Sequence, residues 1–385
     1  MQGTDLQREA ERQATICNAC RYCEGICAVF PAIQMQRSFA AGDIDYLANL
    51  CHNCGACYHD CQFSPPHEFA INLPKTLAGV RQESYGRYAW PRALAPVFER
   101  NGVVVATVAA VSITVFLVGL IALNAPSALF TAHNSPEGFY ALLPHNTMVS
   151  IFGPVFLFAI FAMGMGLRNF WSDANAVRSV DADSPSIWQA IKDAGTLRYL
   201  DGGGVGCFNE DDKPNDRRKL YHHLTFYGFL LCLAATSVGT IYHYGFGRVA
   251  PYPWWDLPQL LGTVGGIALA VGTGGLLVAK RKRLPDMVEP ATRGMDTAFT
   301  LMLHLTAVTG LALHFLALTP LLGVLLALHL GVVFALFLTM PYGKFVHGLY
   351  RFAALCRLAM ARRHGLKAPE APIRSGAPGA APSRG

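Results

Sequence analysis

Eight of the eleven cysteines lie in the first 61 residues and form two runs with the same spacing. The runs read Cys17-x2-Cys20-x2-Cys23-x3-Cys27 and Cys51-x2-Cys54-x2-Cys57-x3-Cys61. This spacing is typical of bacterial ferredoxins, whose thiolates hold [4Fe–4S] clusters. Three thiolates two residues apart can surround one corner of a cubane, whereas the fourth lies too far along the chain to join them. The two runs together therefore predict two [4Fe–4S] clusters.

The fourth cysteine of each run is expected to serve the neighbouring cluster. One ligand set would be Cys17, Cys20, Cys23 and Cys61, and the other Cys51, Cys54, Cys57 and Cys27. The ferredoxin run usually places a proline after its fourth cysteine, but Ala28 and Gln62 stand there, which affects the loop geometry rather than the identity of the ligands. Zinc sites take their ligands as two pairs and disulfides persist in oxidising compartments, so both suit this spacing less well.

Charged residues make up only 15% of the 385 residues, against roughly 25% in soluble domains. The deficit begins at Val103, after which long apolar runs follow one another. A membrane span needs roughly 20 apolar residues, and six segments qualify: 103–123, 148–167, 221–244, 257–279, 297–318 and 321–340. The chain is therefore predicted to be all-α, with an N-terminal helical ferredoxin-like two-cluster module followed by a six-helix transmembrane bundle.

The cysteine module and the bundle are expected to occupy residues 1–75 and 103–348. Within the module, residues 44–50 are predicted to form a helix that leads into the second cysteine run. Basic and aromatic side chains over 76–102 are typical of an amphipathic linker on the membrane surface, although an ordinary solvated helix has the same composition.

The long loop at 168–220 and the end of the chain carry no recognisable chemistry. Residues 186–200 have the periodicity of an amphipathic helix. The glycine-rich stretch 202–206 is interpreted as a flexible turn, because no βαβ pattern surrounds it as in a nucleotide-binding loop. Residues 349–385 are basic and then rich in Pro, Ala, Gly and Ser, which is typical of a disordered tail. No role is assigned to Cys207, Cys232 and Cys356.

Basic residues gather on one side of the six spans. Residues 124–147 and the hairpin after residue 318 contain no Lys or Arg, whereas 168–220, 280–283 and the region from Lys344 onward are rich in them. Because positively charged loops face the cytoplasm, both termini are expected there, in a multi-pass protein of the bacterial inner (cytoplasmic) membrane. Insertion in the lipid bilayer accounts for the net charge of +6, and no nucleic-acid partner is predicted.

Four histidines in or beside the spans are candidate haem ligands. His222 begins the third span and His243 ends it, while His329 lies in the outer half of the sixth span and His347 follows its cytoplasmic end. If the last helix continues unbroken, the 18 residues from His329 to His347 make five turns and place both on one face. Two antiparallel helices would then pair His222 with His347 and His243 with His329, which predicts one or two b-type haems.

Each of these histidines could have a role other than haem ligation, and other histidines could take its place as a ligand. Hydrogen bonding between helices is the alternative function of each histidine. The histidines that could replace a member of a pair are His223, His304 and His314.

Several stretches of the chain share their pattern with one family. They are 17–31 (CNACRYCEGICAVFP), 50–61 (LCHNCGACYHDC), 221–228 (YHHLTFYG) and 329–348 (HLGVVFALFLTMPYGKFVHG). Together they resemble tricarballylate utilization protein B, also called citrate utilization protein B, over nearly the whole chain except the tail. The resemblance implies that the chain reoxidises the reduced FAD of a partner tricarballylate dehydrogenase. Electrons would then pass through the iron–sulfur clusters and haem b to the membrane quinone.

The residues by themselves lead as far as a membrane iron–sulfur electron carrier. The sequence shows no FAD-binding fingerprint and no acid–base constellation, so no catalytic residue is predicted, and the substrate chemistry is expected on a partner FAD-dependent dehydrogenase. Two other functions stay open. One is a quinone-linked subunit of another flavin dehydrogenase or of a disulfide-reductase-like complex, and the other is a membrane redox sensor.

Overall fold

The computed structural model describes residues 3–132, 138–210 and 213–367. Within these ranges the fold is all-α, and the only β-structure consists of two isolated bridges. The helices that build it are α1 (Asp5–Cys20), α2 (Val29–Gln34), α3 (Ala41–Leu50), α4 (Ala56–His59), α5 (Leu73–Tyr88), α6 (Asn101–Leu123), α7 (His145–Ala174), α8 (Ser184–Gly195), α9 (Arg217–Phe246), α10 (Leu257–Arg281), α11 (Arg293–Phe315), α12 (Leu322–Thr339) and α13 (Val346–His364). The predicted fold class is confirmed.

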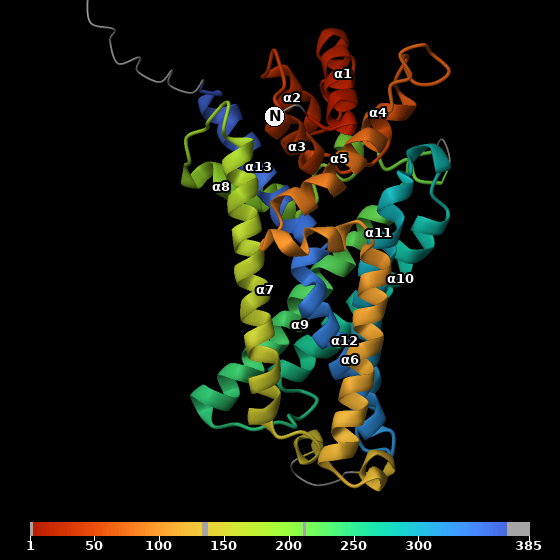
Figure 1. Cartoon of the computed structure of the whole chain (residues 1–385), viewed down its shortest axis with the longest axis vertical. Coiled ribbons are helices and arrows are strands. Elements are labelled where there is room, and N and C mark those ends of the chain that lie inside the picture. Colours follow the sequence, from red (N-terminus) through yellow and green to blue (C-terminus); the bar gives the residue numbers. More distant parts are fainter. Residues whose placement is uncertain (1–2, 133–137, 211–212, 368–385) are drawn as a thin grey trace, which may run out of the picture.

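Buried polar contacts join the first helices into one module. Gln13 of α1 donates to Thr76 of α5 at 3.0 Å, and Asn49 of α3 donates to Ser84 of α5 at 3.0 Å. Because a buried polar group is costly without a partner, these contacts fix how the three helices lie against one another. Figure 1 shows this module at one end of the molecule.

Helix α5 belongs to the cysteine module and not to a membrane-surface linker. Its buried side chains, among them Leu77 and Val80, pack on the module. At its end, Arg87 and Tyr88 both bond to the buried carboxylate of Asp45 in α3. The module thus reaches Tyr88, and the connection to α6 is the short 3-10 helix Arg92–Phe98.

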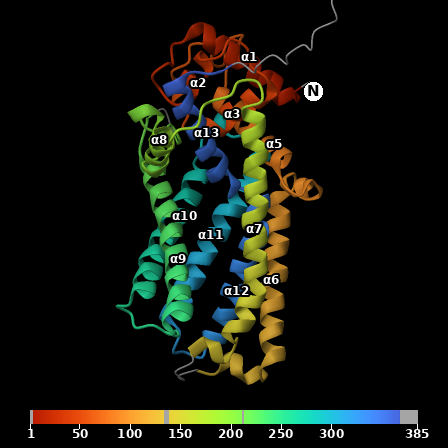
Figure 2. The ribbon, with the colours of Figure 1, turned by 90° about the vertical axis from the view of Figure 1, so that its left-hand side faces the viewer.

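Six of the described helices are long and apolar enough to cross a membrane: α6, α7, α9, α10, α11 and α12. Their mean hydropathy lies between 1.5 and 2.6. Figure 2 shows them running along the long axis of the molecule, below the cysteine module. They correspond to the six predicted spans and indicate a multi-pass membrane protein.

Glycines let α9 and α10 approach each other closely. A Cβ at Gly228 would lie 2.6 Å from the backbone nitrogen of Leu269, and one at Gly265 would lie 2.8 Å from Cβ of Leu231. Small residues permit such contact in a membrane, where lipid provides no hydrophobic force between helices. Packing on α10 therefore fixes the position of α9, which carries His222 and His243.

The chain does not continue as a single helix from α12 to α13. Helix α12 ends at Thr339, a 3-10 turn covers Met340–Tyr342, and Gly343 is extended at φ −143° and ψ −170°. Pro341 lies in this break, where its missing N–H interrupts no helical hydrogen bond. The expectation of five unbroken turns between His329 and His347 is therefore wrong.

Helix α13 runs up into the cysteine module and packs there as a core element (Figure 1). Arg357 is only 1% exposed, and its guanidinium lies 4.2 Å from the ring centroid of Tyr46 and bonds to Asp43. Helix α13 also packs on α8, the amphipathic helix predicted in the long loop. The expected tail 349–385 is thus helical as far as His364, and residues 368–385 lie outside the described residues.

Candidate metal centres

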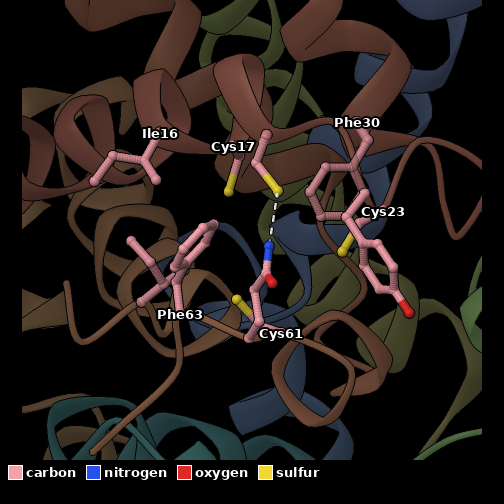
Figure 3. Close-up of a pocket in the computed structure, with 10 residues that line it drawn as sticks. Ile16, Cys17, Cys23, Phe30, Cys61 and Phe63 are labelled. Carbon is pink, nitrogen blue, oxygen red and sulfur yellow. Dashed lines mark hydrogen bonds between the residues drawn. The ribbon is translucent and has the colours of Figure 1, made fainter. Parts of the chain in front are cut away.

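Four cysteines line a pocket at the carboxyl end of α1: Cys17, Cys20, Cys23 and Cys61. Helix α1 ends here because Arg21 is left-handed (φ 58°) and its N–H bonds to the carbonyl of Cys17. The turn at Arg21 brings Cys23 back beside the helix end. Figure 3 shows the sulfurs of Cys17, Cys23 and Cys61 facing a shared space. Because Cys20 is exposed, this first pocket reaches the surface of the module.

The other four cysteines of the two runs line a second, more enclosed pocket: Cys27, Cys51, Cys54 and Cys57. Two left-handed residues, Asn53 (φ 54°) and Gly55 (φ 88°), bend the loop between α3 and α4 around it. The backbone N–H groups of Val29 and Asn53 donate to the sulfurs of Cys27 and Cys51, both at 3.4 Å. Hydrogen bonds to sulfur of this kind tune the potential of an iron–sulfur cluster.

The two pockets divide the eight cysteines into the same two sets as the predicted crossover. All cysteines are free thiols. In the described part of the chain, no three Cys, His, Asp or Glu side chains lie close enough to hold a single metal ion. Four thiols spread around one pocket suit a polynuclear cluster with Cys₄ ligation. The residues present therefore fit one [4Fe–4S] cluster in each pocket.

Burial keeps these thiols protonated while no metal is bound. Burial and then the neighbouring thiolates raise the pKa of Cys17 and of Cys23 to about 12. Burial also raises the pKa of Cys54 to about 12 and that of Cys27 in the same direction. Because only the thiolate ligates, loading with iron must expel these protons. Iron affinity is therefore expected to rise with pH.

The glycine-rich stretch of the long loop covers the second pocket. A Cβ at Gly203 (φ 76°) would lie 2.1 Å from the carbonyl oxygen of Ile26, and one at Gly202 (φ 63°) would lie 3.5 Å from the sulfur of Cys54. The N–H of Phe208 donates to the carbonyl of Cys54 at 2.9 Å. From the sequence alone this stretch had the composition of a flexible turn. Its run of glycines was the one signal of a backbone that packs closely on another.

Two of the predicted haem ligands, His222 and His347, lie next to each other. Their ring centroids are 6.3 Å apart and their planes meet at 75°. A bond between a metal and an imidazole nitrogen is about 2 Å long, so two rings with this centroid separation are close enough to share one metal atom when a nitrogen of each faces it. Nδ1 of His347 faces the carbonyl of Lys344 and can donate to it, which leaves Nε2 free to bind.

The protonation state of His347 also suits a ligand. Burial, and then the positive charges of Arg351 and Lys344, hold the pKa of His347 well below its usual range. The imidazole is therefore neutral at pH 7, as metal ligation requires.

His52 connects this pair with the second pocket. Its side chain lines that pocket and follows Cys51 directly in the chain. Arg218, one helical turn before His222 in α9, donates to the carbonyl of His52 at 3.1 Å, and Arg351, one turn after His347 in α13, donates to that of Cys51 at 2.7 Å. The second pocket, His52 and the His222–His347 pair thus follow one another from the module into the bundle.

The other two predicted ligands, His243 and His329, have different neighbours. His243 stacks on His145, with centroids 3.8 Å apart and an angle of 20° between the planes. Nδ1 of His329 lies 3.0 Å from the hydroxyl of Thr309. No ring contact between His243 and His329 is found among the described residues. A second haem between them stays a prediction.

His304 repeats the arrangement of His329, with its Nδ1 3.0 Å from the hydroxyl of Thr273. The hydroxyls of Thr273 and Thr309 each donate to a carbonyl one turn back, both at 2.6 Å. A hydroxyl that donates its proton in this way accepts from the imidazole, so Nδ1 is the donor and Nε2 is free in both histidines. Both residues keep a nitrogen available for ligation.

Six apolar helices with two four-cysteine pockets at one end define the class: a multi-pass membrane protein with a ferredoxin-like module. Family models match residues 99–368 (citrate utilization protein B) and 10–87 (citrate utilization protein B Fer4-like domain). Citrate utilization protein B of Escherichia coli is 48% identical over 367 residues, which are 95% of each chain. The chain therefore belongs to the citrate utilization protein B family, as the resemblance predicted, and its Fer4-like domain indicates an iron–sulfur electron-transfer role. No solved structure matches the chain.

Proposed function

We propose that this chain is a membrane electron-transfer protein that reoxidises the reduced FAD of a partner tricarballylate dehydrogenase. Two [4Fe–4S] clusters and haem b would carry the electrons to the membrane quinone. The observation that supports this most is the order of the sites. An exposed cysteine pocket, an enclosed cysteine pocket and a histidine pair follow one another from the module surface to the start of the bundle.

Electrons are proposed to enter at the first pocket. Cys20 is exposed there, and the neighbouring Tyr22 is 70% exposed, so a partner flavoprotein can approach this pocket directly. The second pocket lies under Gly202 and Gly203, and its Cys51 and Cys54 are buried. Reduced FAD loses two electrons and two protons. Iron–sulfur clusters accept the electrons one at a time, and the protons go to solvent.

Electrons are proposed to leave through the histidine pair. His222 and His347 would hold haem b with their Nε2 atoms, and His52 lies between this pair and the second pocket. The quinone takes up two electrons and two protons. The Escherichia coli relative is named for citrate utilization, and the identity of the oxidised substrate would be set by the partner enzyme.

The proposal is tested on protein purified in detergent together with the partner dehydrogenase. We expect about eight iron and about eight sulfide per chain in addition to haem iron, and reduction of a quinone analogue when the dehydrogenase receives its substrate. The dehydrogenase alone serves as the control. Zinc in place of iron, or about half the iron in intact protein, would contradict the two clusters. Clusters that are reduced without any quinone turnover would favour a redox sensor.

The proposed orientation places the cysteine module and the 280–283 cluster in the cytoplasm of a bacterium, with the protein in the inner membrane. A thiol introduced by Ser127→Cys lies in the exposed 3-10 helix Pro126–Phe130 at the opposite end of α6. It is expected to react with a membrane-impermeant maleimide in whole cells, whereas Lys282→Cys should react only after lysis. The reverse labelling pattern would mean that the topology is inverted.

A further inference from the structure

Four arginines from separate parts of the chain converge on the backbone of the second cysteine run. We call them the arginine collar: Arg81, Arg218, Arg283 and Arg351. They come from α5, from the start of α9, from the loop after α10 and from α13. Each donates to main-chain carbonyls between residues 48 and 53, which include those of the predicted ligand Cys51 and its neighbours.

Two collar arginines share the carbonyl of Cys51. Arg81 donates to it at 2.7 Å and to the carbonyl of Ala48 at 3.1 Å. Arg351 donates to the carbonyl of Cys51 at 2.7 Å and to that of Asn49 at 3.2 Å. Both guanidinium groups are thus fixed in place on one side of the second pocket.

The other two arginines hold the next part of the loop. Arg218 donates to the carbonyl of Asn53 at 2.6 Å and to that of His52 at 3.1 Å. Arg283 donates to the carbonyl of Asn53 at 3.0 Å. Burial, and then the charge of another collar arginine, lower the pKa of Arg283 and of Arg351 to about 10, so both stay charged at pH 7.

The collar has little negative charge of its own. The ion pairs found in the described part of the chain include none with these four arginines. Two lysines lie in the same neighbourhood: Lys280 donates to the main-chain carbonyl of Asp296, and Lys344 donates to its carboxylate. The four collar arginines therefore leave an excess of positive charge beside the second pocket. A cluster with four thiolates, which carries net negative charge, would offset part of this excess.

The first pocket has no comparable set of arginines on its backbone in the part of the chain that the structure describes. The charged residues within or next to its cysteine loops are Arg21, Glu24 and Asp60, one positive and two negative. The side chain that bonds to its exposed Cys20 is the neutral amide of Gln62, at 4.0 Å. The two pockets therefore differ in how much positive charge lies around them, although their cysteine spacing is the same.

Reduction adds one electron to a cluster, so nearby positive charge raises its potential and nearby negative charge lowers it. Building on the proposed function, we propose that the arginine collar gives the second cluster a higher potential than the first and thereby directs electrons from the module surface toward His222 and His347. Each transfer would move one electron from the first cluster to the second, with no bond or proton exchanged. The collar residues would act only through their charge on the potential of the second cluster, and they would contact no substrate.

The test is a redox titration of the purified holoprotein followed by electron paramagnetic resonance. Cys54→Ser, which removes a ligand of the second cluster, identifies the signal of that cluster. We expect the second cluster to be reduced first. Arg351→Gln removes one charge and should shift the electron-sharing equilibrium between the clusters about tenfold toward the first, which is about 59 mV for one electron.

Three further variants separate charge from structure. Arg351→Lys keeps the charge and should leave the reduction potential of the second cluster as in the unmodified protein. Arg81→Gln removes a different collar charge and tests the same shift in potential if Arg351→Gln loses the second cluster. Arg363→Gln, on the exposed side of the same helix, is the matched control and should change nothing. Equal potentials, a lower potential for the second cluster, or no shift in both Gln variants would overturn this inference and leave the proposed function standing. Absence of both clusters would overturn the proposed function and this inference together.

Discussion

Replacing Cys54 by serine is expected to lower the iron content of the purified protein from about eight atoms to about four. Cys54 is 7% exposed and lies in the second pocket, and its backbone carbonyl accepts from the N–H of Phe208 in the covering loop. A serine hydroxyl is a weaker ligand than a thiolate and leaves that pocket with three thiols. Because metal binding contributes folding free energy directly, the module should also melt about 10 °C lower.

Cys207 provides the matched control for this variant. It is buried in the same cluster of side chains as Cys54, but its Sγ donates to the carbonyl of Leu200 at 2.7 Å. Cys207→Ser keeps a donor at that position and should retain about eight irons. If Cys207→Ser lost iron while Cys54→Ser retained it, the ligand set of the second pocket would have to include Cys207. Iron and acid-labile sulfide analysis, together with a thermal melt followed by circular dichroism, distinguishes these outcomes.

Spacing along the chain was enough to group the cysteines, because three members of each set lie in one run and the ferredoxin pattern assigns the fourth to the other run. The two pockets contain the sets expected from the runs, with Cys61 beside Cys17 and with Cys27 beside Cys51. The six apolar helices could also be predicted from the sequence, since a membrane span is defined by local composition. What is local in sequence could be predicted from sequence.

Features that depend on distant parts of the chain could not be predicted in this way. Arg351 lies 300 residues beyond Cys51, the residue whose carbonyl it binds. In the sequence it looked like one more basic residue of a cytoplasmic tail. Gly203 likewise contacts Ile26, far earlier in the chain, and in the sequence it looked like part of a flexible turn. Neither assignment follows from composition or periodicity.

The histidine predictions depended on helix arithmetic that a single break invalidates. Pairing at both ends required an unbroken helix from His329 to His347, but Pro341 and the extended Gly343 separate α12 from α13. His347 nevertheless lies beside His222, because α13 starts again at Val346, next to the start of α9. The pair near the module thus rests on observed proximity, and the outer pair rests on the sequence argument alone.

His347→Ala is expected to remove the low-spin haem spectrum and to lower quinone reduction about tenfold or more. The ring of His347 lies 6.3 Å from that of His222, and its Nδ1 faces the carbonyl of Lys344, so Nε2 is held ready as a ligand. Alanine removes that nitrogen and would leave His222 without a partner across the proposed haem iron. The clusters lie outside this pair and should keep their iron and remain reducible by the flavoprotein.

His223 offers the closest control, because it follows His222 directly in α9. Its ring stacks on Tyr227, with centroids 6.0 Å apart, and not on His347. His223→Ala should therefore keep the haem spectrum, whereas His222→Ala should lose it as His347→Ala does. If His223→Ala lost the haem spectrum and His222→Ala retained it, the haem ligand on α9 would be His223. A full haem spectrum in His347→Ala, recorded on protein with intact clusters, would exclude this pair as the haem site and direct the search to His304 and His329, whose Nε2 atoms are also free.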